Sequence, residues 1–351
     1  MAVFTVLGAG MMGSALCVPL VDRGHEVRLV GTPLDGAIVE GLERDHVHPT
    51  LKLPLSEAIR PYPSEQLSEA MDGADALALG VSSAGIDWAC DAIAPHVRPG
   101  LPLFMITKGL RWDGERLAVL PDVVKAKLPE AVRDEVHPAA VAGPCIAGEL
   151  ARRVPSCVIL AGRHQATLTS LASLLRADYY HVWTSTDVVG VEACAALKNA
   201  YAMGVAFGAG IHLARGGEPG SVAMHNVESA VFAQALTEMG LIIDAMGGDG
   251  RTAAGLAGAG DLDVTNNGGR TGRFGRWLGT GLNREQAIEK MAGATLECLE
   301  IIAVMREASR GLIAAGELAP GSLPLLDHMA EVVLDDRPVD LPFSAFFGGS
   351  S

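Results

Sequence analysis

The stretch VFTVLGAGMMGSALCVPLVDRGHEVRLVG, residues 3–31, decides the fold of the first half of the chain. An apolar β-run at 2–8 precedes a helix-like segment at 11–24 that ends at Gly24, and a second β-run follows at 25–31. The order strand, helix, strand predicts a βαβ unit with two parallel strands.

Three glycines lie where the first β-run meets the helix. Gly8, Gly10 and Gly13 have the spacing G-x-G-x-x-G, which is weak evidence in isolation but here follows a strand and opens a helix. Glycines permit the tight turn, and backbone N–H groups at a helix N-terminus bind a pyrophosphate. We therefore predict a dinucleotide site that includes Met11 and Met12, rather than an ordinary glycine-rich turn.

The end of the second β-run bears on the choice of cofactor. NAD-binding folds usually place an acidic residue there to accept hydrogen bonds from the ribose, but this run continues as GTPLD, residues 31–35. The missing acid leans slightly toward NADPH, with Thr32 as a cofactor contact, although the turn has no arginine for a 2′-phosphate. Asp35 is interpreted as a solvated turn residue, and the choice between NAD and NADP stays open.

Five more apolar β-runs precede residue 187. They lie at 74–81, 101–107, 139–144, 156–162 and 179–185. Helix-like or loop-like segments separate the first three, so the order predicts an α/β fold with a doubly wound parallel Rossmann sheet over residues 1–186. The last two runs are expected to extend the edge of that sheet.

The character of the sequence changes near Asp187. The β-branched runs stop, and long segments rich in Ala, Leu, Glu and Met follow, among them 226–247 and 283–316. We predict a second, all-helical domain over residues 187–340.

Composition excludes several classes of partner. A net charge of −14 and an isoelectric point near 5.1 argue against binding of nucleic acid or of an anionic membrane surface. The six cysteines show no C-x-x-C spacing, so neither a disulfide framework nor a metal site is indicated, and a cytoplasmic location fits best. The apolar N-terminus lacks the basic residues of a signal peptide. The apolar run 188–211 carries charged residues and several glycines, so we expect no membrane-spanning segment.

The stretch ALKNAYAMGVAFGAG, residues 196–210, reads as a buried helix, yet it contains Lys198 and Asn199. A buried charge is strongly unfavourable unless it is paired or takes part in chemistry. Lys198 therefore needs a partner or a catalytic role. The alternative is a lysine whose long stem carries the ammonium group to the surface.

Five motifs, in one order, resemble those of the NAD(P)-dependent glycerol-3-phosphate dehydrogenase family. They are GAGMMG at 8–13, TKGL at 107–110, AGPCIAGE at 142–149, EACAALKN at 192–199 and GLAGAGDLDVTNNGGRTGRFG at 255–275. The resemblance implies a Rossmann domain followed by a helical domain of the 6-phosphogluconate dehydrogenase type, which binds substrate and carries catalytic residues. It also implies a homodimer that reversibly reduces dihydroxyacetone phosphate to sn-glycerol 3-phosphate for glycerophospholipid synthesis.

The resemblance also assigns roles to individual residues. Lys198 matches the family's catalytic acid or base, which protonates the ketone oxygen as hydride arrives. Asn199 matches a residue that binds substrate hydroxyls, and Asp261 one that pairs with Lys198 or with a substrate hydroxyl. Lys108 matches a lysine that meets both cofactor and substrate, and it completes the catalytic set.

Further contacts are implied on the neighbouring loops. Substrate contacts are expected at Gly143, Cys145, Thr265, Gly269, Arg270 and Thr271, and cofactor contacts at Ala147, Arg270 and Glu297. Arg270 suits phosphate because a guanidinium group donates two parallel N–H bonds. No residue cluster calls for a metal ion.

The chain departs from the commoner family sequence at several of these positions. Cys145 replaces a serine, and a thiol is the weaker hydrogen-bond donor. The triplet GRT at 269–271 stands where SRN is usual, in a shortened loop, and Cys298 follows Glu297 where glycine is common. These departures leave another phosphorylated hydroxyketone open as the substrate.

Two other functions are weighed against this one. Other dehydrogenases that join a Rossmann domain to a helical one, of the 6-phosphogluconate or ketopantoate type, also use a lysine on a helix, but they lack the combination of ALKN with GDLDVT. A non-catalytic nucleotide sensor would keep the three glycines of the first motif. It would be free to lose Lys108, Lys198, Asp261 and Arg270, which this chain retains.

Overall fold

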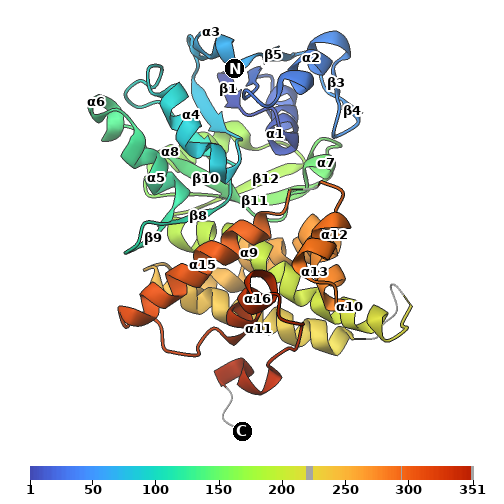
Figure 1. Ribbon diagram of the computed structural model, residues 1–351. Helices are drawn as coiled ribbons and strands as arrows, with labels where there is room; N and C mark the ends of the chain where they lie inside the picture. Colours follow the sequence, from blue (N-terminus) through green and yellow to red (C-terminus); the bar gives the residue numbers. More distant parts are fainter. Residues whose placement is uncertain (219–223, 294, 349–351) are drawn as a thin grey trace. The chain divides into compact units, whose positions relative to one another are not determined.

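The computed structural model describes residues 1–218, 224–293 and 295–348, which form two compact units (Figure 1). The first unit comprises Met1–Lys108 and Val119–Val188. The second comprises Gly109–Ala118 and the chain from Val189 onward. The change from one unit to the other after Val188 lies beside the change in sequence character at Asp187.

The first unit is built on one eight-stranded sheet, with the strand order β12-β11-β10-β7-β6-β1-β2-β5. Its strands are β1 (Val3–Leu7), β2 (Glu26–Val30), β5 (Ile59–Tyr62), β6 (Ala76–Leu79), β7 (Leu103–Met105), β10 (Ala139–Ala142), β11 (Ser156–Gly162) and β12 (Tyr180–Ser185). Every predicted β-run is a strand of this sheet. The doubly wound Rossmann fold predicted from the sequence is therefore confirmed.

Two features of the sheet differ from the sequence prediction. Strands β10 and β11 pair antiparallel, while the other pairs are parallel. The connection between them contains only the four-residue helix α7 (Ala147–Leu150), and a short connection favours antiparallel neighbours. Strand β5 was not predicted because Pro61 interrupts its apolar pattern, and its place at the sheet edge tolerates that proline.

Helices cover both faces of the sheet. They are α1 (Met11–Asp22), α2 (Gly36–Asp45), α3 (Leu67–Met71), α4 (Ile86–Ile93), α5 (Leu120–Lys127), α6 (Glu130–Arg133) and α8 (Gln165–Leu175). Successive strand residues point to opposite faces. Phe4 and Val6 belong to a core shared with α1 and α8, whereas Leu77 and Leu79 belong to a core shared with α3, α4 and α5. Both faces are apolar, as a parallel sheet requires.

The second unit is helical, as predicted. Its helices are α9 (Val188–Val205), α10 (Phe207–Ala214), α11 (His225–Ala245), α12 (Asp261–Gly268), α13 (Arg270–Gly279), α14 (Arg284–Glu289), α15 (Glu297–Ala314) and α16 (Pro324–Leu334). No helix among the residues described is both long and apolar enough to cross a membrane.

A short hairpin also belongs to the second unit. It consists of β8 (Leu110–Trp112) and β9 (Leu117–Val119). The sequence places this segment within the first domain, but the structure groups residues 109–118 with the helices. The reason is local packing: a Cβ atom on Gly311 of α15 would lie 2.5 Å from the ring of Trp112, so the indole fills the place left by the missing side chain.

Glycines let the helices around α9 approach closely. Helix α9 is buried on all sides over residues 191–205, as expected for a helix that is apolar all round. A Cβ atom on Gly275 of α13 would lie 2.2 Å from the carbonyl oxygen of Met203 in α9. On Gly210 of α10 it would lie 2.2 Å from the carbonyl oxygen of Arg276. These contacts hold α13 against α9, the helix that carries Lys198, and α10 against α13.

A buried carboxylate joins three helices of this unit. Glu238 of α11 accepts hydrogen bonds from the Tyr201 hydroxyl at 2.9 Å and from the Gln234 amide at 2.8 Å. It also accepts bonds from the backbone N–H groups of Leu325 and Leu326 at 2.7 and 2.9 Å, in the first turn of α16. Burial raises the pKa of Glu238 to about 7, although these donors act in the opposite direction.

We predict that Gly275→Ala destabilises the protein. Its Cβ would overlap a backbone oxygen that cannot move without moving α9, and such overpacking typically costs about 1–3 kcal/mol. Thermal unfolding checks this. Gly36→Ala, at the first residue of α2 with no atom within 4 Å of its Cβ, is the matched control and should unfold no earlier than wild type. Equal midpoints for the two variants would contradict the close packing.

We also predict that Glu238 makes folding pH-dependent. Its pKa is about 7 in the folded chain against an ordinary value of 4.5, so between these values the folded state binds more protons than the unfolded state. The free energy of unfolding should therefore fall as pH rises through this window, by up to about 3 kcal/mol.

Denaturant titrations of wild type and Glu238→Gln between about pH 4 and pH 8 measure this contribution. The amide cannot ionise, so the difference in unfolding free energy between the two proteins should change across the window. The control is Glu285→Gln, an exposed glutamate of α14, which should run parallel to wild type. Parallel curves for Glu238→Gln would disprove the prediction.

Candidate functional site

The residues predicted to bind cofactor in the first unit meet at one edge of the sheet. Strands β1, β6, β7 and β10 are parallel neighbours, so their carboxyl ends lie side by side. The glycine-rich loop follows β1, Lys108 follows β7 and Gly143 follows β10. In open α/β sheets this edge, at the point where the strand order reverses, is where ligands bind.

Each glycine of the first motif has a separate structural reason. Gly8 has φ +115°, and a Cβ there would lie 2.6 Å from the carbonyl carbon of Gly80. A Cβ on Gly13 would lie 2.0 Å from the Gly8 carbonyl oxygen, so α1 packs directly on the loop. Gly10 precedes the first residue of α1 and has no atom within 4 Å of its Cβ position. The loop therefore leaves open space at a helix N-terminus, which is the arrangement a pyrophosphate needs.

Asp35 and Thr32 lie next to this loop. One carboxylate oxygen of Asp35, Oδ2, accepts hydrogen bonds from the Ala9 N–H at 3.2 Å, the Thr32 N–H at 2.9 Å and the Thr32 hydroxyl at 2.8 Å. Asp35 is thus not a solvated turn residue, because its carboxylate holds the loop backbone. The sequence did not predict this contact, which joins residues 26 positions apart.

The remaining predicted residues of the first unit surround the same edge. Lys108 is half-buried, and the turn before it is fixed by a 2.7 Å bond from the Thr107 hydroxyl to the carbonyl of Val81. Gly143 has φ +127° and lies against the backbone of β11. Met12, Cys145 and Ala147 are partly buried and pack against one core cluster. Met11 follows Gly10 as the first residue of α1.

The second unit contains a buried ion pair. The ammonium group of Lys198 on α9 contacts the Asp261 carboxylate, and the two residues are only 5% and 1% exposed. Lys198 therefore does not reach the surface, and the structure provides the partner that a buried charge requires. The pair can hold an ammonium group in an apolar environment, where it can donate a proton to an adjacent oxygen.

A short π-helix places Asp261. The segment η4 (Leu256–Gly260) has π-helical hydrogen bonding and leads directly into α12, whose first residue is Asp261. Glycines permit this turn, because a Cβ on Gly258 would lie 2.0 Å from the carbonyl oxygen of Ala253. π-Helical turns are rare and occur often at functional sites.

Asn199, beside Lys198, reaches a different helix. Its amide nitrogen donates a 2.8 Å hydrogen bond to Glu297, the first residue of α15. Asn199 is 9% exposed while Glu297 is exposed, so the bond runs from the buried helix toward the surface. The two residues, predicted to bind substrate and cofactor respectively, are thereby brought together.

The second half of α12 and the first residues of α13 carry the other predicted contacts of this unit. The Thr265 hydroxyl donates a 2.6 Å bond to the carbonyl of Asp261. Gly269 precedes Arg270, the first residue of α13, and a Cβ on Gly269 would lie 2.2 Å from the carbonyl oxygen of Thr265. Arg270 is half-buried, and within the described part of the chain no carboxylate pairs with it. Thr271 is buried, and its side chain lies next to the buried Cys298 thiol.

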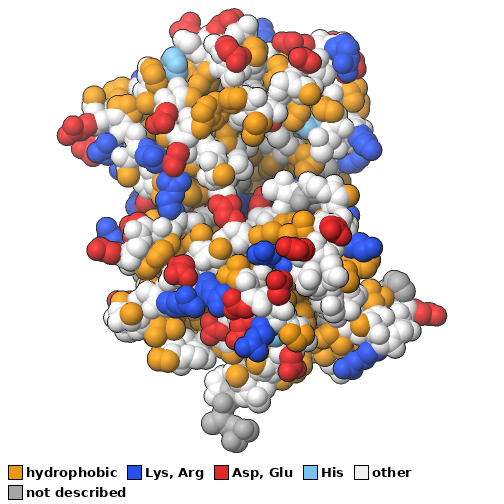
Figure 2. Space-filling view, in the orientation of Figure 1, with side chains coloured by type: hydrophobic (Ala, Val, Ile, Leu, Met, Phe, Trp, Pro, Cys, Tyr) orange, Lys and Arg blue, Asp and Glu red, His pale blue; other side chains and the backbone are white. Residues whose placement is uncertain are grey.

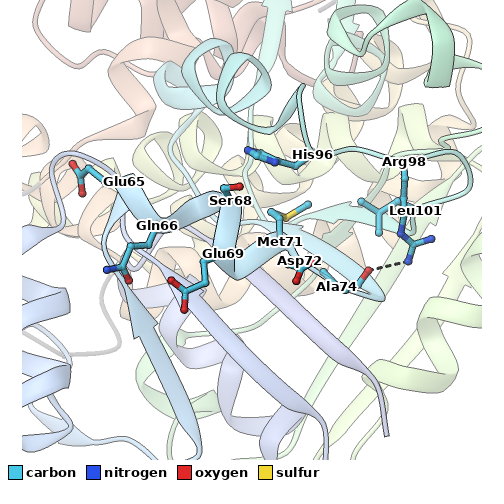
Figure 3. Close-up of a pocket in the computed structure, with 11 residues that line it drawn as sticks. Glu65, Gln66, Ser68, Glu69, Met71, Asp72, Ala74, His96, Arg98 and Leu101 are labelled. Atoms are coloured by element: carbon cyan, nitrogen blue, oxygen red, sulfur yellow. Dashed lines mark hydrogen bonds between the residues drawn. The ribbon is translucent and has the colours of Figure 1, made fainter.

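A separate cavity lies at the amino ends of strands β6 and β7, away from the carboxyl ends described above (Figure 3). It measures about 710 Å³ and is lined by residues that precede β6 and β7, with Glu65, Glu69 and Asp72 on its wall. The guanidinium group of Arg98 donates a 2.9 Å hydrogen bond to the Ala74 carbonyl. Because it borders the amino ends of the strands, this cavity is not the predicted dinucleotide site.

The face of the molecule in Figure 2 shows no large patch of a single charge sign. In Figure 2 acidic and basic side chains are interspersed over the face shown. The described residues contain no group of three or more His, Cys, Asp or Glu side chains that could hold a metal ion.

Comparison with known proteins supports both units. Residues 3–168 match the family model described as NAD-dependent glycerol-3-phosphate dehydrogenase N-terminus, and residues 187–342 match the corresponding C-terminus model. The NADP(+)-dependent glycerol-3-phosphate dehydrogenase of Archaeoglobus fulgidus is 34% identical over 82% of this chain and 83% of its own length. The glycerol-3-phosphate dehydrogenase [NAD(P)+] of Geobacter metallireducens is 30% identical over 95% and 93%.

The structural comparison agrees. The crystal structure of glycerol-3-phosphate dehydrogenase from Coxiella burnetii superposes with a TM-score of 0.79, at 27% identity, over 95% of each chain. That similarity extends across both units.

We predict that Gly10→Ala folds like wild type but binds dinucleotide at least about tenfold more weakly. Its Cβ meets no protein atom within 4 Å, yet it would occupy the space that a pyrophosphate needs against the helix N-terminus. Cofactor titration by fluorescence, together with thermal unfolding, checks both halves. The control is Gly36→Ala, which should bind as wild type does. Unchanged affinity in Gly10→Ala would place the cofactor elsewhere.

Proposed function

Since the chain belongs to the NAD-dependent glycerol-3-phosphate dehydrogenase family, we propose that it catalyses the reversible NAD(P)H-dependent reduction of dihydroxyacetone phosphate to sn-glycerol 3-phosphate. The observation that carries this proposal is the buried pair of Lys198 and Asp261. Reduction of a ketone needs a proton donor at the oxygen, and a buried, paired ammonium group is such a donor.

Lys198 is proposed as the acid of the reduction and the base of the reverse reaction. NAD(P)H, when bound, supplies the hydride to the carbonyl carbon. Lys198 then gives its proton to the oxygen, and the Asp261 carboxylate keeps the ammonium charged until that moment. Asn199 is proposed to orient the hydroxyl groups of the substrate, since its second N–H and its carbonyl oxygen are not used by the bond to Glu297.

Arg270 is proposed to bind a phosphate. It lies at the N-terminus of the ten-residue helix α13, and no carboxylate in the described chain neutralises it. A guanidinium group and the free N–H groups of a helix N-terminus both attract a phosphate. Gly269 packs against the backbone of Thr265 beside it, while Thr271 is buried next to Cys298. In the first unit, Lys108 and the 143–147 segment are proposed to contact cofactor and substrate.

NADPH is proposed as the preferred cofactor. Strand β2 is followed by Gly31, so no carboxylate stands where NAD enzymes accept a ribose hydroxyl. The Asp35 oxygen that lies near this point already accepts three hydrogen bonds. The Archaeoglobus fulgidus relative is described as NADP(+)-dependent, and this name also favours the proposal.

Three further attributes are proposed on the family resemblance and the composition. They are a homodimer, a cytoplasmic location and a role in supplying the backbone of glycerophospholipids. Sedimentation of the purified protein tests the first of these directly.

We predict that Lys198→Met lowers kcat by about 10²–10⁴, the usual contribution of a general acid, and leaves cofactor affinity unchanged. Initial rates of NADPH and NADH oxidation with dihydroxyacetone phosphate measure this, and unphosphorylated dihydroxyacetone is the substrate control. The matched control variant is Lys290→Met, whose lysine is exposed on the same unit.

Because Lys198→Met leaves Asp261 buried without its partner, the double variant Lys198→Met/Asp261→Asn separates chemistry from stability. It should remain inactive while unfolding close to wild type. Normal turnover in either variant would refute the acid role. A wild-type enzyme that is inactive with dihydroxyacetone phosphate but active with another phosphorylated hydroxyketone would instead revise the substrate.

A further inference from the structure

Three side chains contact the backbone of one residue of the glycine-rich loop, Ala9. The carbonyl oxygen of Ala9 accepts a 2.9 Å bond from the Ser14 hydroxyl and lies 3.1 Å from Nε2 of His48. The N–H of the same residue donates to Asp35 at 3.2 Å. Ala9 stands between Gly8 and Gly10, where glycine freedom would otherwise leave the backbone loosely held.

The protonation state of His48 follows from its other contacts. Nδ1 accepts hydrogen bonds from the backbone N–H groups of Thr50 and Leu51 at 3.2 and 3.1 Å. That nitrogen therefore carries no proton, so the proton of the neutral ring is on Nε2 and is donated to the Ala9 carbonyl. Burial lowers the pKa of His48, which favours this neutral form.

His48 is itself rigidly placed. It lies on β3 (Val47–His48), which pairs with β4 (Leu53–Pro54) in a tight hairpin. The side chain is completely buried, and the N–H of Lys52 closes the hairpin through a 2.8 Å bond to the His48 carbonyl. The imidazole is consequently a fixed donor that reaches the loop from 39 residues away.

Asp35 accepts the hydrogen bond from the Ala9 N–H. Its backbone ends the turn that follows β2, and its carboxylate also accepts both the N–H and the hydroxyl of Thr32. The backbone of Ala9 is thus linked to the β2–α2 turn by its N–H and to the β3–β4 hairpin by its carbonyl, so the peptide groups on both sides of Ala9 are held. Neither hydrogen bond involves Gly10, whose Cβ position has no atom within 4 Å.

We propose that Asp35 and His48 are positioning residues that hold the glycine-rich loop in its cofactor-binding conformation. This inference rests on the proposed function, since it concerns the same cofactor site. A loop fixed in advance loses less conformational entropy when the pyrophosphate binds. Loss of either link should therefore weaken NADPH and NADH by the same factor, because the pyrophosphate is common to both.

The test is the dissociation constant of each cofactor, measured by fluorescence in the absence of substrate. His48→Leu should raise both constants by about five- to tenfold, as expected for one lost hydrogen bond, while kcat at saturating cofactor stays near wild type. His48→Gln should restore most of the affinity, since its amide nitrogen can donate to the same carbonyl. Asp35→Ala, which removes the oxygen that accepts the Ala9 N–H, should weaken both cofactors equally.

The alternative role for Asp35 is direct contact with the ribose, and the same measurement separates the two. In that case Asp35→Ala would weaken NADH alone and leave NADPH unchanged or tighter, which would overturn the positioning role. The control is His181→Ala, an exposed histidine on β12, which should bind both cofactors normally. Thermal unfolding confirms that each variant is folded.

The outcomes distinguish this inference from the proposed function. Wild-type affinity in both His48→Leu and Asp35→Ala would overturn the positioning role and leave the dehydrogenase assignment intact. A folded wild-type protein that binds neither cofactor would overturn both.

Discussion

The contact between the Lys198 ammonium and the Asp261 carboxylate constrains the whole helical unit. An ion pair that is almost fully buried is tolerated only when its geometry is fixed, because neither charge can be rehydrated locally. Lys198 is fixed by a helix that is buried all round. Asp261 is fixed by the π-helical turn that precedes α12. Much of the surrounding packing serves to keep these two backbones in place.

That packing relies on backbone contact and on a second buried carboxylate. Gly275 and Gly210 let α13 and α10 lie directly against their neighbours. Three residues after Lys198, Tyr201 donates to Glu238, which also receives the first N–H groups of α16. The helix that carries the ammonium group is therefore tied at one point by an ion pair and at another by a hydrogen-bonded network. Such a network gives a single arrangement rather than a set of similar ones.

The sequence predicts the fold well where a signal is local. Gly8, Gly10 and Gly13 between two apolar runs define the βαβ unit, and the loss of β-runs near Asp187 marks the helical unit. Contacts between distant positions could not be predicted in this way. Nothing around His48 indicates that it reaches Ala9, and Asp35 looks like an ordinary turn residue until the loop is placed beside it. The ion pair was foreseeable only because a buried lysine demands a partner.

The departures from the commoner family sequence also acquire a physical reason. Thr271 stands where asparagine is usual, and Cys298 stands where glycine is common; the structure buries both side chains next to each other inside the second unit. The two changes are therefore better regarded as one exchange than as two losses. Their neighbours Arg270 and Glu297 keep their places at the first residues of α13 and α15. The two substituted side chains thus lie in the interior of the unit, while Arg270 is half-buried and Glu297 is exposed.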